Sequence, residues 1–285
     1  MNWRKEVKYK YYFSILSMFR NESWNLKEWI EHYKYHGADH IYLIDDFSDD
    51  DYLPIVQPYI DEGYVTLIMN EVSERYTGRQ IDITNKYGLP LTKESKWIAH
   101  LDSDEYLYSP DYVDLKELLV QYEDYGTILT NWVWFNSSDF IEHPKDGIVK
   151  NFTKRAEYNV RVFFTRNDCM NPRGKFEPQW ETFNAAKGIA NSDFNIKHFN
   201  VHDIFTDGPT INLGYKTDEE NPKLLLNHYK IQSREYWEKV KMKDIYDANH
   251  YYFTGDSHGW HEFYSSDVGD IVDERLKEQN MGMES

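Results

Sequence analysis

Short apolar runs alternate with amphipathic stretches along the first half of the chain. The runs, which contain β-branched and aromatic residues, predict strands at 11–18, 40–44, 64–69, 97–101 and 127–135. The amphipathic stretches, in which apolar residues recur every three or four positions, predict helices at 24–36, 53–60, 77–87 and 111–122. Because strands and helices alternate at this spacing, the pattern predicts βαβ units and a mostly parallel sheet flanked by helices.

After about residue 136 the pattern becomes irregular. Pro144, Asp146 and Gly147 are typical of a loop or hairpin over 136–150. Further on we expect a strand at 160–165, a polar surface loop at 207–222, a short strand at 224–229 and a helix from about Ser233 to 249. One α/β domain with an irregular C-terminal half is the simplest account of the whole pattern.

Polar clusters follow three of the predicted strands where each strand ends. They are Arg20-Asn21-Glu22, Asp45-Asp46 and Asp102-Ser103-Asp104-Glu105. The carboxyl ends of parallel strands meet at one edge of a sheet, where ligands bind in open α/β folds. Three carboxylates so close together repel one another unless a cation lies between them. Because hard oxygen ligands suit Mg²⁺ or Mn²⁺, we interpret Asp102 and Asp104 as holding a metal that binds a nucleotide's phosphates; the alternative is a solvated acidic turn.

Composition and charge narrow the class of partner. The 285 residues carry a formal charge of -17, which argues against a nucleic-acid or anionic-membrane partner, since either needs a basic face. The 24 Tyr and 9 Trp supply flat side chains that stack on sugars and bases. The single cysteine, Cys169, excludes an internal disulfide and suggests a reducing compartment. Without a membrane-length apolar run or a signal peptide, we expect a soluble, cytoplasmic protein with no membrane span.

Several short blocks, in the right order, resemble glycosyltransferase family 92 and its relatives near family 2. They lie at 19–23, 26–29, 36–42, 46–49, 97–106, 134–138, 187 with 201–203, and 227–229 with Ser233 and Lys239. One departure is Asn136, which stands where the family usually has glycine. The resemblance runs from about residue 13 to 245 and implies a GT-A fold, a nucleotide-sugar donor and a divalent metal, usually Mn²⁺. In a single domain spanning 1–285, about 9–135 would form the nucleotide-sugar-binding half and about 136–280 the acceptor-binding half.

The resemblance implies roles around the metal. Asp104 would be the direct ligand, while Asp102 would contact the ribose, or the metal through water, and Ser103 would lie against the donor. Enzymes with this fold often add a histidine from late in the chain, and His228 and His202 are the candidates. A structural histidine on a strand is the alternative for each of them.

Four further residues are expected at the donor. Arg20, Glu22 and Asp46 would frame the nucleoside, and an aspartate at the end of the second strand can accept a uracil N–H, which favours uridine nucleotides. The alternative for Asp46 is to cap the next helix. Arg79 could reach the phosphates, unless it is a solvated arginine on a helix surface.

The general base is expected after the metal-binding strand. A carboxylate that accepts the acceptor's proton needs a pKa raised towards neutrality by partial burial. Glu177, Glu181 and Asp203 lie in the right part of the chain, and Trp180 beside Glu181 could stack on the acceptor ring. We choose Glu181; the alternative is a loop carboxylate among the chain's 49 acidic residues.

Together these features predict an inverting, metal-dependent glycosyltransferase. It would move a hexose or pentose from a nucleotide sugar, UDP-linked by preference, to a hydroxyl of a glycan acceptor. One alternative is a nucleotidyltransferase or metal phosphohydrolase on a similar sheet, although residues 19–22 lack the glycine-rich loop usual in the former. Another is a carbohydrate-binding protein without catalysis. The sugar, linkage, acceptor and oligomeric state do not follow from the sequence.

Overall fold

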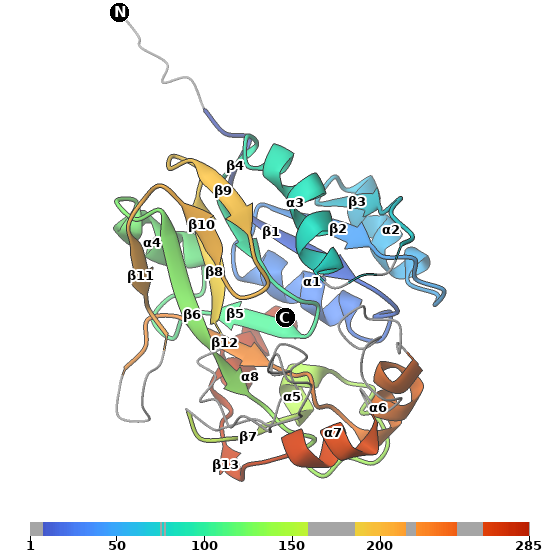
Figure 1. Cartoon of the computed structure of the whole chain (residues 1–285). Coiled ribbons are helices and arrows are strands. Elements are labelled where there is room, and N and C mark those ends of the chain that lie inside the picture. Colours follow the sequence, from blue (N-terminus) through green and yellow to red (C-terminus); the bar gives the residue numbers. More distant parts are fainter. Residues whose placement is uncertain are drawn as a thin grey trace, which may run out of the picture.

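The computed structural model describes residues 8–74, 76, 78–158, 186–214, 221–243 and 259–284. Within these ranges nine strands form one sheet, in the order β3-β2-β1-β4-β8-β6-β12-β5, with β11 beside β6 (Figure 1). The strands are β1 (Tyr11–Phe19), β2 (His40–Asp45), β3 (Val65–Met69), β4 (Ser95–His100), β5 (Glu105–Tyr108), β6 (Thr127–Trp134), β8 (Ala186–Asn191), β11 (Thr210–Asn212) and β12 (Leu225–His228). Neighbours from β3 to β4 are parallel, whereas β8 is antiparallel to both β4 and β6.

The helices of the first half connect these strands. They are α1 (Leu26–Tyr35), α2 (Leu53–Asp61), α3 (Arg79–Leu91) and α4 (Leu115–Leu119), the last continued by a 3₁₀ turn at Val120–Tyr122. Gly37 ends α1 with a φ of 85°, a conformation that glycine adopts without strain. These helices alternate with parallel strands, so the first half is built from the βαβ units that the pattern predicts.

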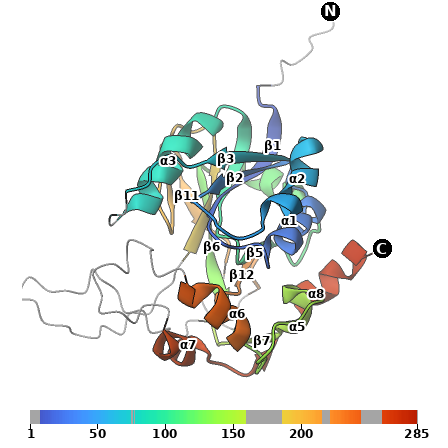
Figure 2. The same ribbon diagram turned by 90° about the vertical axis from the view of Figure 1, so that its right-hand side faces the viewer.

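Shorter elements make up the second half. They are α5 (Ile148–Asn151), β7 (Lys154–Arg155), β9 (Ile196–Phe199), β10 (Ile204–Thr206), α6 (Arg234–Lys239), α7 (Trp260–Ser266), β13 (Ile271–Val272) and α8 (Arg275–Asn280), with 3₁₀ turns at Lys241–Lys243 and Met281–Glu284. Most of the late elements gather at one end of the molecule, lowest in Figures 1 and 2. Strands β8, β11 and β12 return to the central sheet, so both halves of the chain contribute to it.

Apolar side chains cover both faces of the sheet. In β2, Ile41 and Leu43 join the larger buried cluster, which includes Trp29 of α1, while Tyr42 and Ile44 join a second cluster on the other face. This alternation follows from the two-residue period of a strand. A sheet covered on both faces explains why its strands form near-continuous apolar runs in the sequence.

The expected GT-A architecture, a mostly parallel sheet flanked by helices with an irregular second half, is confirmed. The five strands and four helices predicted for the first half are all present, with ends shifted by a few residues. The surface loop expected at 207–222 is wrong in part, because β11 lies within it and pairs with β6. Of the helix expected from Ser233 to 249, the structure shows α6, which ends at Lys239, while 244–249 lie outside the described residues; its cap is confirmed, since Ser233 Oγ accepts the N–H of Tyr236 at 3.1 Å. The strand expected at 160–165 lies outside the described residues.

None of the helices in the described part of the chain has the length and apolar composition needed to cross a bilayer.

A buried histidine at the end of β4 predicts loss of stability in mild acid. Burial lowers the pKa of His100 to about 4, with the Lys187 charge adding to the effect. The unfolded chain therefore takes up a proton between pH 6.5 and 4 that the folded protein excludes, so stability present above pH 6.5 falls as the pH drops. Once the pH is below both pKa values, this protonation lowers the free energy of unfolding by about 3 kcal/mol. Urea unfolding between pH 7 and 4.5 should show a shallower loss for His100→Gln than for wild type; parallel curves would contradict this.

Candidate active site

The polar ends of β1, β2 and β4 lie at one edge of the sheet. The three strands are parallel neighbours, with Phe19 of β1 opposite Asp45 of β2 and Leu16 opposite His100 of β4. A lysine joins two of the ends directly, because Lys241 Nζ lies 2.8 Å from Glu22 Oε1 and 3.0 Å from Asp104 Oδ2. The gathering of polar strand ends that the sequence predicts is therefore present.

A buried ion-pair network fixes the turn after β4. Glu105 belongs to β5 rather than to a solvated turn, and it is fully buried. Its Oε2 accepts the N–H of Asp102 at 2.8 Å, and its Oε1 accepts the indole N–H of Trp132 at 2.6 Å. Lys187 of β8 places Nζ 2.8 Å from Asp102 Oδ2 and 3.3 Å from Glu105 Oε2. The turn is thus held from three strands.

Charge and burial act in opposite directions on these carboxyl groups. Burial raises the pKa of Glu105 well above its usual value although Lys187 opposes the shift. Burial also acts to raise the pKa of Asp102, but the Lys187 ammonium outweighs it and the pKa is lowered. Asp102 is therefore the ionised partner of Lys187.

Asp104 has a different partner on each carboxylate oxygen. Oδ1 lies 3.3 Å from His228 Nε2, and Oδ2 lies 3.0 Å from Lys241 Nζ. Burial acts to raise the pKa of Asp104, but Lys241 and His228 bring it well below its usual range. Burial lowers the pKa of His228, which favours the neutral imidazole. The Asp104 backbone carbonyl accepts the N–H of Tyr229 at 2.8 Å, which ties the turn to the end of β12.

Glu22 is anchored from α6 and from its own loop. Its Oε2 accepts the hydroxyl of Tyr236 at 2.7 Å and the side-chain amide of Asn25 at 2.8 Å. Burial raises the pKa of Glu22, and Lys241 opposes that shift. The residue is 5% exposed, so it is part of the buried edge rather than a surface carboxylate.

The carboxylate and imidazole groups at this edge suit a metal ion that also binds a substrate. Three buried carboxyl groups, Glu22, Asp104 and Glu105, and the partly exposed Asp102 lie beside two ammonium groups, so carboxyl groups outnumber ammonium groups. In the described ranges no three His, Cys, Asp or Glu side chains gather into a complete metal cage. However, Mg²⁺ that binds a diphosphate takes only one or two carboxylates and completes its shell with phosphate oxygens and water. Asp104 Oδ1 and His228 Nε2 lie 3.3 Å apart. Two ligand atoms that each bind one ion at about 2.1 Å have a separation of this order.

A second buried ion pair stands at the end of β2. Both guanidinium nitrogens of Arg79 lie 2.5 Å from an oxygen of Asp46, and Asn70 Nδ2 adds a hydrogen bond of 2.8 Å. Arg79 is 3% exposed, so it is not a solvated helix-surface residue. Its other contacts are the backbone carbonyls of Glu74 and Val72. The guanidinium thus orients Asp46 instead of extending towards the turn after β4.

The remaining donor-side candidates lie nearby. Ser103 is buried in the turn between the two aspartates, and Arg20 is partly buried directly after β1. The rings of His202 and Trp132 meet edge to face, with their centroids 5.1 Å apart. The ring centroids of His228 and Trp132 are 4.2 Å apart. Both histidines thus contact Trp132, and His228 also contacts Asp104 directly.

Of the candidate bases, only one falls in the described part of the chain. Glu177 and Glu181 lie outside it. Asp203 is partly buried, its Oδ1 accepts the N–H of Ile204 at 2.7 Å, and burial raises its pKa. The turn that carries it lies beside the end of β4, because His100 Nδ1 is 3.2 Å from the Asn200 carbonyl oxygen.

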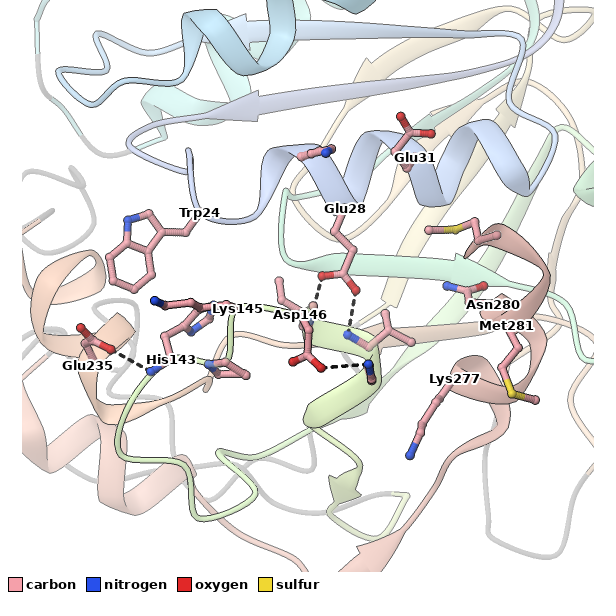
Figure 3. Close-up of a pocket in the computed structure, with 17 residues that line it drawn as sticks. Trp24, Glu28, Glu31, His143, Lys145, Asp146, Glu235, Lys277, Asn280 and Met281 are labelled. Atoms are coloured by element: carbon pink, nitrogen blue, oxygen red, sulfur yellow. Dashed lines mark hydrogen bonds and ion pairs between the residues drawn. The ribbon is translucent and has the colours of Figure 1, made fainter. Parts of the chain in front are cut away.

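A separate groove lies between α1, residues 143–150 and the C-terminal helix α8. Its volume is ≈ 950 Å³, and Figure 3 shows Trp24 at one end and Met281 at the other. Glu28 points across it and accepts the N–H groups of Ile148 and Val149 at 2.5 and 3.0 Å. Since this central carboxylate is already bound by the protein's own backbone, we assign the groove no role in the site.

Solved structures with a similar arrangement include two of TarS from S. aureus and one of HddC from Yersinia pseudotuberculosis. TarS residues 1–349 in complex with UDP-GlcNAc is 14% identical, with a TM-score of 0.42 and coverage of 79% of this chain and 60% of that one. The same fragment in complex with UDP is 14% identical, with a TM-score of 0.38 and coverage of 70% and 60%. HddC is 14% identical, with a TM-score of 0.37 and coverage of 79% and 96%. The chain thus spans less than two thirds of the TarS fragment, and similarity at this level carries no argument about substrates.

Comparisons with curated proteins and with protein-family models gave different results. A comparison with curated protein sequences found no match. The model described as glycosyltransferase family 92 matches residues 9–257, from just before β1 to beyond α6. This range contains the polar strand ends, Lys187, Lys241, His202 and His228, and it agrees with the resemblance drawn from the short blocks. The chain belongs to glycosyltransferase family 92.

Proposed function

We propose that the protein is an inverting, metal-dependent glycosyltransferase that moves a sugar from a UDP-linked donor to a hydroxyl of a glycan. The observation that carries this proposal is the meeting of Glu22, Asp104 and His228 at the carboxyl edge of a parallel sheet. In open α/β sheets this edge is where nucleotide ligands bind. Membership of the family supports the reaction class.

The proposed metal site consists of Asp104 and His228. Mn²⁺ or Mg²⁺, when bound there, would offset the negative charge that develops on a departing nucleoside diphosphate. The protein's own contribution is to hold the Asp104 carboxylate ionised, because Lys241 and His228 keep its pKa well below the usual range. Asp102, fixed by Lys187 and by the backbone contact to Glu105, is the candidate for the ribose, with Ser103 beside it.

The proposed nucleoside site includes Arg20, Glu22 and Asp46. Preference for uridine rests on Asp46, which can accept a uracil N–H while Arg79 and Asn70 hold its side chain. The bidentate contact with Arg79 keeps this carboxylate oriented before a donor arrives.

Inversion requires a carboxylate that takes a proton from the acceptor hydroxyl. Asp203 has the partial burial and the raised pKa that this task needs, and its turn contacts the end of β4. Glu181, our choice from the sequence, and Glu177 remain the other candidates. The acceptor-binding role of residues 136–280 is part of the same proposal.

Donor turnover with and without chelator tests the proposed function. The purified protein is incubated with a panel of nucleotide sugars and Mn²⁺, and nucleoside diphosphate release is measured with and without a glycan acceptor. EDTA should lower the rate about 100-fold or more, and added Mn²⁺ should restore it, because the charge of the leaving group is then offset again. The anomeric configuration of the product, read by NMR, tests inversion. Pyrophosphate release from a nucleoside triphosphate, or turnover unaffected by EDTA, would contradict the proposal.

A further inference from the structure

Lys241 reaches the acidic edge from the turn after α6 and stays partly exposed. It lies in the 3₁₀ turn after α6, and its ammonium contacts Glu22 Oε1 at 2.8 Å and Asp104 Oδ2 at 3.0 Å. Its side chain is 16% exposed, whereas the side chain of Lys187 is 1% exposed. Lys187 is thus enclosed by the protein, whereas Lys241 keeps some contact with solvent.

The position of Lys241 competes with a metal ion at the same carboxylate. A divalent cation held by Asp104 and His228 would lie next to an ammonium group that contacts the other oxygen of Asp104. Two positive groups at this spacing repel each other, and the repulsion is strong in a partly buried site. Lys241 cannot therefore keep its contact with Asp104 at no cost once a metal is bound.

Each carboxylate that Lys241 contacts keeps a partner on its other oxygen if the ammonium moves. Glu22 would keep its hydrogen bonds from Tyr236 and Asn25, and Asp104 would keep His228. Lysine carries a compact charge on a flexible stem, which suits a contact that changes partner. It is also a common ligand of phosphate groups.

Building on the proposed function, we propose that Lys241 is a diphosphate-binding residue with two positions. While the site is empty its ammonium neutralises Glu22 and Asp104. When the metal and the donor bind, the ammonium leaves Asp104 and contacts the donor's diphosphate. Lys241 would then do two opposite things: oppose metal binding in the empty site and strengthen diphosphate binding in the loaded one.

Two binding measurements with opposite expected signs test this. Lys241→Gln removes the charge and keeps much of the length; Lys239→Gln is the matched control, because Lys239 lies two residues away and pairs only with Glu235 among its described contacts, at 2.6 Å. Mn²⁺ alone, titrated into the nucleotide-free protein, should bind Lys241→Gln about tenfold more tightly than wild type. UDP, and pyrophosphate as a probe without a base, should bind it about tenfold more weakly at saturating Mn²⁺. Lys239→Gln should match wild type in every titration.

The outcomes separate this inference from the proposed function. Unchanged or weaker Mn²⁺ binding by Lys241→Gln would overturn the competition with metal, and unchanged UDP and pyrophosphate binding would overturn the diphosphate contact. Lys241→Arg keeps the charge and should retain near wild-type diphosphate affinity; it serves as the second variant if Lys241→Gln does not fold, and an affinity as low as that of a neutral side chain would also overturn the proposal. None of these titrations needs turnover, so a wild-type protein that transfers no sugar would refute the proposed function alone.

Discussion

Replacing Asp104 with asparagine should lower sugar transfer about 1,000-fold while the protein stays folded. Asparagine keeps the size of the side chain but removes the charge that faces His228 and Lys241. Loss of one group that stabilises a developing charge typically lowers the rate about 100- to 1,000-fold. Because Asp104 is also the proposed metal ligand, we expect the upper end of that range. Folding should survive, because Lys241 retains Glu22 as a partner and the backbone contact of Asp104 with Tyr229 is unaffected. Initial rates with the best donor, together with circular dichroism, measure both effects.

Asp111 provides the control for this experiment. It is an exposed carboxylate that pairs with Lys223 at 2.8 Å, so Asp111→Asn removes one negative charge of the same kind away from the strand ends. Its rate should stay within about twofold of wild type, since exposed ion pairs contribute little. An active Asp104→Asn enzyme, or an equal loss in both variants, would remove the catalytic role that we give to Asp104.

The parallel half of the fold follows from the sequence because its elements obey simple periodic rules. Residues such as Ile41, Leu43 and Ile44 form an apolar run only because both faces of β2 are buried. Strand β8 escapes the same rule. Its sequence, Ala-Lys-Gly-Ile-Ala-Asn, has one β-branched residue, and Gly188 is there because Ile204 approaches so closely that a Cβ would meet it at 3.1 Å. Long-range packing, not local preference, makes this segment a strand.

The candidate site also has a part that the sequence predicts and a part that it does not. The rule that parallel strands end at one edge predicts that Glu22 and Asp104 come together, and a lysine bridges them. The lysines themselves cannot be predicted so easily. Lys187 is 85 residues from Asp102, and Lys241 is 137 residues from Asp104, so no local spacing links either pair. For Lys187 the sequence offers two signs, its place in a family block and its position inside the small-residue stretch of β8, where a solvated side chain does not belong. Burial of Glu105 is missed for the same reason, since its partners come from β6 and β8.

Replacing Lys187 with methionine should destabilise the protein by about 3–5 kcal/mol and also disturb the turn after β4. Methionine fills a similar volume but leaves Asp102 and Glu105 without the ammonium group between them. Removing one member of a buried ion pair costs more than the pair contributes, because the remaining charge stays buried and uncompensated. Urea unfolding at pH 7 measures the loss, and the free energy of unfolding should fall with little change in m-value.

A second substitution distinguishes loss of charge balance from loss of packing. In Lys187→Met with Asp102→Asn, the ionised partner of Lys187 has been neutralised as well, so the double variant should be less destabilised than the sum of the two single variants. A packing defect would instead give additive losses. Lys197 of β9 is the matched control: its side chain is 55% exposed and pairs with Asp207, so Lys197→Met should shift stability by less than about 0.5 kcal/mol.

Donor binding should separate the roles of Lys187 and Lys241 further. Lys187→Met weakens UDP binding only through Asp102, whereas Lys241→Gln should weaken pyrophosphate binding as well. If Lys187→Met unfolds at the urea concentration of wild type, the ammonium does not hold the turn, and Asp102 owes its position to its contacts with Glu105 and Gln80.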